Sequence, residues 1–259
     1  MAMPRSRMRR WAVLILLAAV FVVLWLARDE APEKAGAPVP TASPVTGASA
    51  LPGASPTTPV PLSPPASGSF PPSAARAGEQ LAGLTVAWGK NWQTYRRAEF
   101  GRFYTDEHNG VGGRNGCDTR DDVLARDLDE LRRGDRNPCV VLSGVLHDPL
   151  TGKTLPYRYR GATGINIDHV VPLGAAWRAG AYAWSPQRRI DFANDLDELL
   201  AVDQQANQDK GSQTPDKWKP RRAYWCEYAR RWTGVKAKYG LTVTAPEKLA
   251  LQDMLATCS

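Results

Sequence analysis

The first 78 residues limit where a globular core can form in this chain. Residues 31–78 consist almost entirely of Pro, Ala, Ser, Thr and Gly, and 12 of the 21 prolines lie between Pro32 and Pro72. Such a segment cannot bury enough apolar surface to offset its chain entropy, so its composition predicts a disordered, semi-extended linker. A folded domain is therefore expected only in residues 79–259, a length of about 180 residues that can bury a sizeable core.

An apolar run before the linker indicates export. Residues 11–27 carry no charged side chain, and a helix of this length spans roughly 25 Å, which is short but sufficient for a transmembrane anchor. The arginines before it keep the amino terminus in the cytoplasm. We therefore predict that residues 1–30 are a basic tip and a single-pass anchor in the cell membrane, with the domain outside. In the alternative, a signal peptide is cleaved near Ala35–Ala37 and the protein is secreted.

Cysteine usage agrees with export. Because the four cysteines all follow the linker and their number is even, the sequence predicts two disulfides in an oxidising compartment. The absence of any C-x-x-C pair argues against a structural zinc site. Three pairings exist, and we prefer the one in which each bridge closes a short loop around one predicted helix. That pairing is Cys117–Cys139 with Cys226–Cys258.

Hydrophobic spacing after residue 117 predicts helices mixed with short strands. Leucines recur at helical spacing in 119–133, and two extended runs flank a turn-rich segment in 140–160. Short strands followed by helices are typical of an α+β domain. The expected elements are helices at 119–133, 220–239 and 246–258, a β-hairpin at 140–160, a strand at 165–171, and helical or turn-like segments at 186–194 and 199–207.

Positive charge is concentrated near the carboxy terminus. The formal net charge of the chain is +7, which alone does not establish nucleic-acid binding. Residues 217–239, however, hold eight Lys/Arg and one acid, interleaved with six aromatic residues. We expect the aromatic side chains to face the core, and the basic side chains to form a nucleic-acid-facing surface, where they neutralise phosphates.

The chain contains only three histidines, His108, His147 and His169. The first two lie in glycine-rich or turn-like segments and are expected at the surface. His169 follows Asp168 at the end of a predicted strand, where an acid and an imidazole can point into one small volume. An isolated Asp-His pair is more simply explained by a structural histidine, so the surrounding residues decide the interpretation.

Three spaced motifs surround this pair: D-H-V-V-P-L from Asp168, the apolar L-L-A-V from Leu199, and N-x-x-K-G from Asn207. Together they resemble the HNH endonucleases that contain a ββα-metal finger, in particular the branch of the carboxy-terminal domain of GmrSD restriction endonucleases. The resemblance covers roughly residues 95–258. Further matching blocks are Asn115–Arg120, Asp148–Lys153, Ala176-Trp177, Gly180-Ala181, Trp218 and Pro220.

The resemblance implies a ββα-metal (HNH) core with added helices, and a catalytic role for each motif. Neutral imidazole is well suited to accept a proton near neutral pH, so His169 is expected to activate water. Asp168 and Asn207 are expected to hold a divalent metal, Mg²⁺ or alternatively Mn²⁺, through oxygen atoms. Asp118, Arg120 and Lys210 are candidates for binding the substrate phosphates; the alternatives are a structural ion pair for the first two and a solvated side chain for Lys210.

One position departs from the family pattern. HNH fingers usually have a middle asparagine about nine residues before the last metal ligand, where it helps to hold the histidine loop. Here that position is Glu198, and Asn194 lies four residues earlier. Either Asn194, which we count among the catalytic residues, shapes the loop, or Glu198 accepts the hydrogen bond instead.

These observations predict a metal-dependent HNH endonuclease that hydrolyses DNA, and also RNA as a second candidate, with low sequence specificity because no base-reading module is apparent. Nucleic acid is the expected partner, the membrane is contacted through the amino-terminal helix, and no protein partner is evident. One alternative is a catalytically silent, disulfide-stapled envelope module that binds nucleic acid or a partner. A weaker alternative is an envelope hydrolase with a different substrate.

Overall fold

The computed structural model describes residues 70–259, which belong to one compact unit. The predicted membrane span at 11–27 and most of the predicted linker lie outside the described residues. Within residues 70–259, no helix is both long and apolar enough to cross a bilayer. Helix α2 (Ala74–Gly83) spans residue 79, where the sequence predicts the domain to begin, and it buries Ala77 and Leu81.

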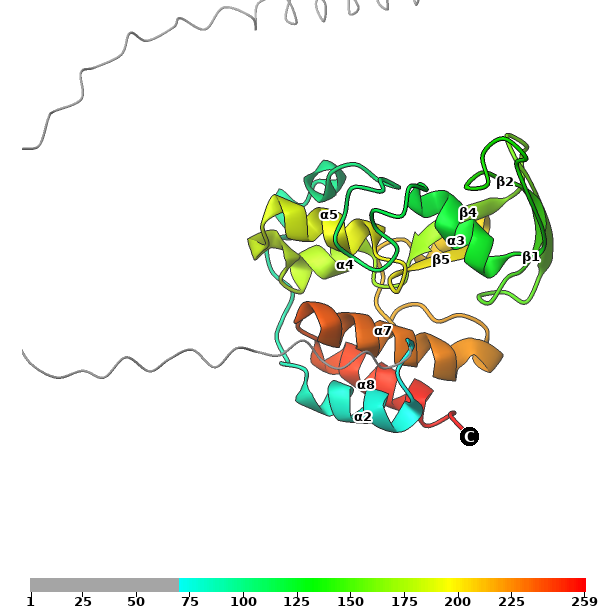
Figure 1. Cartoon of the computed structure of the whole chain (residues 1–259). Helices are drawn as coiled ribbons and strands as arrows, with labels where there is room; N and C mark the ends of the chain where they lie inside the picture. The colour runs from blue at the N-terminus through cyan, green and yellow to red at the C-terminus, as the bar shows by residue number, and fades with distance from the viewer. Residues whose placement is uncertain (1–69) are drawn as a thin grey trace, which may run out of the picture. The chain divides into compact units, whose positions relative to one another are not determined.

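The described chain is a mixed α+β structure, as the sequence predicts (Figure 1). It contains one three-stranded antiparallel sheet in the order β1-β2-β3 and one two-stranded antiparallel sheet of β4 and β5. The elements after α2 are α3 (Thr119–Asp127), β1 (Asp129–Arg133), β2 (Val141–His147), β3 (Thr154–Arg158), β4 (Ile165–His169), α4 (Leu173–Arg178), α5 (Pro186–Asn194), β5 (Leu199–Asp203), α6 (Gln204–Lys210), α7 (Trp225–Tyr239) and α8 (Ala245–Leu255).

The structure corrects two expected segments, the helix at 119–133 and the helical or turn-like segment at 199–207. The helix expected at 119–133 ends at Asp127, and residues 129–133 instead form β1, which pairs with β2. The segment 199–207 begins as strand β5, whose residues are all buried, and becomes helical only at Gln204. A short, fully apolar run fits a buried strand and a buried helix equally well, and here the pairing with β4 decides between them.

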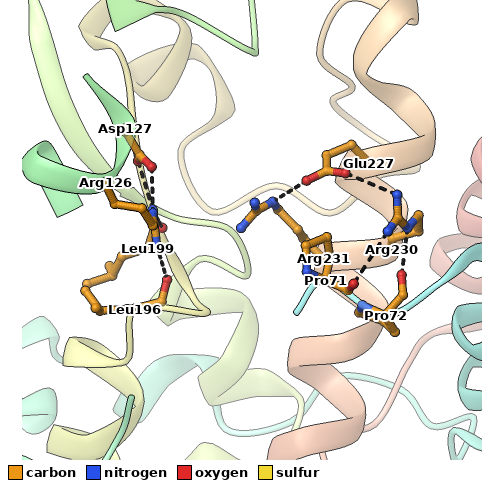
Figure 2. Close-up of polar contacts among 9 residues, drawn as sticks. All are labelled: Pro71, Pro72, Arg126, Asp127, Leu196, Leu199, Glu227, Arg230 and Arg231. Carbon is orange, nitrogen blue, oxygen red and sulfur yellow. Dashed lines mark hydrogen bonds and ion pairs between the residues drawn. The ribbon is translucent and has the colours of Figure 1, made fainter. Parts of the chain in front are cut away.

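The end of α3 is tied to the start of β5. The guanidinium of Arg126 donates to the carbonyl oxygens of Leu196 and Leu199 at 2.5 and 2.6 Å (Figure 2). Asp127 pairs with Arg126 and also accepts a hydrogen bond from the backbone N–H of Ala201 at 2.8 Å. These bonds satisfy backbone groups at the strand edge and hold β5 in place.

Helices α2, α7 and α8 pack side by side (Figure 1). On α7 the buried residues Tyr228, Trp232, Val235 and Tyr239 follow one helix face, so the aromatic residues of this segment belong to the core, as expected. The Cys226–Cys258 disulfide joins the first turn of α7 to the end of the chain after α8, and Cys117–Cys139 joins the loop before α3 to the turn before β2. This is the pairing that the sequence favours.

Four of the eight basic residues expected to form a nucleic-acid-facing surface lie on α7, and all four are engaged in ion pairs. Arg230 and Arg231 pair with Glu227, and Arg230 also donates to the carbonyl oxygens of Pro71 and Pro72 (Figure 2). The remaining two are also paired: Lys236 is buried against Glu247, and Lys238 contacts Asp195 and Asp197. Much of the charge that the sequence concentrates here is therefore used in internal ion pairs.

Candidate active site

The candidate site is built by β4, β5 and α6. Asp168 pairs with Leu200 and His169 with Leu199 across the two-stranded sheet. Helix α6 follows β5 directly, because the Asp203 side chain caps it by accepting from the Ala206 N–H at 2.9 Å. This short strand–strand–helix unit brings Asn207 next to the end of β4.

Asp168, His169 and Asn207 line one cavity of about 420 Å³, which we call the β4–α6 cavity. The structure therefore brings together the three residues at the centre of the sequence-based hypothesis. Asp168 and His169 are 4% and 5% exposed, so their chemistry takes place in a largely desolvated position. Other lining residues are Tyr95, Arg97, Tyr104, Asn166 and Ser212.

The hydrogen bonding of His169 defines which ring nitrogen is free. Its Nε2 lies 3.0 Å from the carbonyl oxygen of Ala193, and because a carbonyl only accepts, Nε2 carries the proton and donates. The Nδ1 atom is then left with a lone pair. Burial lowers the pKa of His169 from 6.5 to about 3, so the imidazole is neutral at physiological pH. The ring is therefore in the neutral form that a proton acceptor requires, although the same burial makes it a weaker base than a free histidine.

Lys210 lies in the interior, in contrast to the phosphate contact expected from the sequence. Its Nζ donates to both carboxylate oxygens of Asp168, at 2.6 and 2.8 Å, and to the backbone oxygen of His169 at 2.6 Å. The side chain is 0% exposed, and all three N–H donors of the ammonium are used. Burial raises the pKa of Asp168, and the adjacent Lys210 opposes this shift. Lys210 therefore orients Asp168 and the end of β4.

Glu198 contacts the loop after His169, and Asn194 does not. The Glu198 carboxylate accepts from the Val171 N–H at 3.1 Å, and its backbone oxygen accepts from the Val170 N–H at 2.8 Å. The sequence leaves open whether Asn194 or Glu198 holds this loop, and in the structure Glu198 accepts the hydrogen bonds. Asn194 is fully buried and instead bonds backbone atoms of Thr105 and Arg102. It therefore supports the segment that carries Phe103 and Tyr104 beside the cavity.

The position of Glu198 makes a prediction about stability. Burial raises the pKa of Glu198 well above its usual value, so the folded protein binds this proton more tightly than the unfolded chain does. Stability should therefore fall as pH rises from about 4.5 through the folded pKa. We expect Glu198→Gln to reduce this loss, and Glu198→Ala to destabilise the protein by about 1–3 kcal/mol because the Val171 N–H loses its acceptor. Urea unfolding at pH 5 and pH 8 measures both effects; equal curves for all three proteins at both pH values would disprove them.

Asp118 and Arg120 are not brought into the β4–α6 cavity with Asp168, His169 and Asn207. Asp118 is exposed and caps α3 by accepting from the Asp121 N–H at 2.8 Å. Arg120 is half-buried, and its charge partly opposes the rise in the pKa of Tyr104 that burial causes. Among the residues that the structure describes, neither side chain lines the β4–α6 cavity. Of the two, only Arg120 is near a cavity residue.

The other two histidines differ from each other. His147 is exposed on β2, as expected, and lies near Asp129 and Thr154. His108 is 1% exposed rather than on the surface, because the loop around it folds over the amino-terminal end of α3, where its Nε2 lies 3.4 Å from the hydroxyl oxygen of Thr119. Neither ring lines the β4–α6 cavity within residues 70–259.

Sequence reasoning missed the contribution of residues 88–97 to the site. Tyr95 and Arg97 line the β4–α6 cavity, and the Arg97 guanidinium lies 4.3 Å from the centre of the Phe103 ring. This segment holds three basic residues, three aromatic residues and no acid. The same mixture of basic and aromatic residues that drew attention to 217–239 could have identified it.

Asp168 and Asn207 supply oxygen donors of the kind that a hard divalent cation prefers, and a cation at Asp168 would have to displace Lys210 from at least one carboxylate oxygen. Asp168 offers carboxylate oxygens and Asn207 an amide oxygen at the same cavity, and oxygen atoms are the ligands that Mg²⁺ prefers. Between residues 70 and 259, no group of three or more His, Cys, Asp or Glu side chains is arranged to hold a metal. Two protein ligands with the remaining positions taken by water and phosphate would suit Mg²⁺, which dehydrates reluctantly.

Comparisons with known proteins agree with the geometry. The family model of the GmrSD restriction endonuclease C-terminal domain matches residues 118–254, which include Asp168, His169 and Asn207. An "uncharacterized secreted protein" of Arthroderma benhamiae is 41% identical over 190 residues, covering 72% of this chain and 87% of that protein. No solved structure matches the chain.

Proposed function

Because the chain belongs to the family of the GmrSD restriction endonuclease C-terminal domain, we propose that it is a metal-dependent HNH-type endonuclease that hydrolyses phosphodiester bonds of DNA. The observation that carries this proposal is the convergence of Asp168, His169 and Asn207 on one cavity. In this proposal β4, β5 and α6 are the ββα-metal core. Low sequence specificity and a second activity on RNA belong to the same proposal.

The residues of the cavity have distinct roles in the proposed reaction. His169 accepts the proton of the attacking water at Nδ1, while Ala193 holds Nε2 and fixes the ring. Asp168 and Asn207 would hold the divalent metal, which when bound offsets negative charge on the phosphate. Arg97, which lines the cavity, would bind a phosphate oxygen.

We also propose that the domain works outside the cytoplasm. The relative from Arthroderma benhamiae is described as secreted, and the two disulfides suit an oxidising compartment. The proposed organisation is an anchor or signal in 1–30, a linker after it, and a nuclease domain that begins before the predicted residue 79, because α2 starts at Ala74 and buries Ala77. The anchor and most of the linker lie outside the described residues.

A second candidate function is favoured by one specific contact. Lys210 occupies both carboxylate oxygens of Asp168, which is the arrangement expected of a catalytically silent envelope module that binds nucleic acid or a partner without cutting it. The two functions differ in whether a metal displaces Lys210 from Asp168.

A plasmid assay separates the two functions. The full chain, purified with both disulfides formed, is incubated with supercoiled plasmid DNA and Mg²⁺, Mn²⁺ or EDTA. The endonuclease proposal expects conversion to nicked or linear DNA with metal and none with EDTA. Retention of the plasmid without cleavage under every metal condition would support the silent module instead.

A further inference from the structure

A second cavity adjoins the β4–α6 cavity. It has a volume of about 480 Å³, and Trp88, Arg178 and Lys217 are among its lining residues. Ser212 lines both cavities, and the Arg178 guanidinium donates to the Ser212 backbone oxygen at 2.8 Å. The turn after α6 therefore separates two hollows that are close enough for one extended ligand to occupy both.

Trp88 is a solvent-exposed residue on a backbone segment that hydrogen bonds hold in place. It is 77% exposed, although backbone hydrogen bonds fix the chain on both sides of it. The Ala87 N–H donates to the Val243 oxygen at 2.9 Å, and the Lys90 N–H donates to the Arg178 oxygen at 3.0 Å. A large apolar ring that is exposed on an anchored segment contributes little to the core, so packing does not explain its position.

Trp92 forms a second exposed ring between the two cavities. It is 46% exposed and stacks on Tyr95 with ring centres 5.2 Å apart and planes 13° apart. Tyr95 lines the β4–α6 cavity, and Arg178 of the second cavity lies 5.0 Å from the centre of the Trp92 ring. The indole N–H of Trp177 fixes this turn by donating to the Asn91 oxygen at 2.9 Å. Trp92 therefore contacts one lining residue of each cavity, Tyr95 of the β4–α6 cavity and Arg178 of the second cavity.

The charges around these rings suit a polyanion. Segment 88–97 contributes three basic residues and no acid. The acids lining the second cavity are paired: Asp216 lies 3.5 Å from Lys217, and Glu247 lies against the buried Lys236. Arg178 adds a further positive charge, so the cationic side chains outnumber the acids along this path.

We propose that an unpaired nucleic-acid strand runs from the β4–α6 cavity into the second cavity, with one base stacked on Trp88 and another on the exposed part of Trp92 that Tyr95 and Arg178 leave open. This inference rests on the proposed function and adds that the substrate strand is bound unpaired, a form that supercoiled plasmid DNA offers where its duplex opens locally. Aromatic rings stack on any exposed base, whereas a duplex hides its base faces between neighbouring pairs. Basic side chains along the path contact the backbone phosphates.

Binding without cleavage tests this inference. The full chain in EDTA is titrated into labelled oligodeoxythymidylate, oligouridylate and a DNA duplex of the same length, and fluorescence anisotropy gives each Kd. We expect tighter binding of a single strand than of the duplex, and the two single strands show whether DNA or RNA is preferred. Trp88→Ala and Trp92→Ala should each raise the single-strand Kd about 5- to 100-fold and leave the duplex Kd nearly unchanged.

Tyr159→Ala is the matched control, since Tyr159 is 44% exposed and lies outside both cavities. Its single-strand Kd should equal that of the parent. The inference is overturned if both tryptophan variants bind single strands like the parent, or if they lose duplex affinity equally. Because the metal is removed by EDTA, the binding assay tests stacking separately from cleavage. If the parent cuts plasmid but the tryptophan variants bind single strands as it does, only this inference is rejected. If binding behaves as expected but no plasmid is cut with any metal, only the endonuclease proposal is rejected.

Discussion

Replacing His169 with alanine is expected to slow plasmid cleavage about 10²- to 10⁴-fold, which is the usual contribution of a general base. In the proposed reaction the neutral ring, held by the Ala193 carbonyl at Nε2, would accept the proton of the attacking water at Nδ1. Alanine removes the proton acceptor and leaves Asp168 and Asn207 in place. Initial rates of nicking with saturating Mg²⁺ measure the effect.

His147→Ala provides the matched control for this experiment. His147 is exposed on β2, and its contacts with Asp129 and Thr154 lie outside the β4–α6 cavity. Its cleavage rate should equal that of the parent. Circular dichroism and thermal unfolding confirm that each variant is folded. A His169→Ala protein that is folded and cuts as fast as the parent would contradict the assignment of His169 as the base.

Lys210→Met is expected to lower the free energy of unfolding by about 3–5 kcal/mol. The substitution keeps an unbranched apolar side chain but removes the ammonium that pairs with both oxygens of Asp168. Since Asp168 is 4% exposed, its charge would be left in the interior without a partner. Urea unfolding at neutral pH, with disulfides intact, measures the change.

Two further variants make the test of Lys210 specific. Lys217→Met removes an exposed partner of Asp216 and should change stability by less than about 1 kcal/mol. The double variant Asp168→Asn with Lys210→Met removes both buried charges and should recover much of the lost stability. A loss below about 1 kcal/mol for Lys210→Met alone would show that the pair does not stabilise the end of β4.

The sequence predicts the centre of the site better than its surroundings. The motifs that contain Asp168, His169 and Asn207 have a family spacing, and that spacing corresponds to strands β4 and β5 followed by α6. Their convergence on one cavity follows from the pairing of β4 with β5 and from the helix that starts directly after β5. The sequence leaves the loop contact open between Glu198 and Asn194, because the choice depends on which side chain reaches Val171.

Features that depend on distant contacts could not be derived from pattern alone. A lysine after a helix is normally solvated, and Lys210 is buried only because β4 presents Asp168 and a backbone oxygen to it. The basic residues of α7 appear free in the sequence, yet their partners, such as Glu247 and Asp195, come from other segments. Segment 88–97 reaches the site only through tertiary packing.

In the proposed function, Asp168 and Asn207 hold a divalent metal beside His169. Anomalous diffraction from crystals of the protein soaked with Mn²⁺ tests it most directly. We expect one peak in the β4–α6 cavity, about 2.0–2.3 Å from oxygen atoms of both Asp168 and Asn207, with Lys210 displaced from at least one Asp168 oxygen. Crystals that bind Mn²⁺ only elsewhere, or that retain the Asp168–Lys210 pair with no peak in this cavity, would contradict the account.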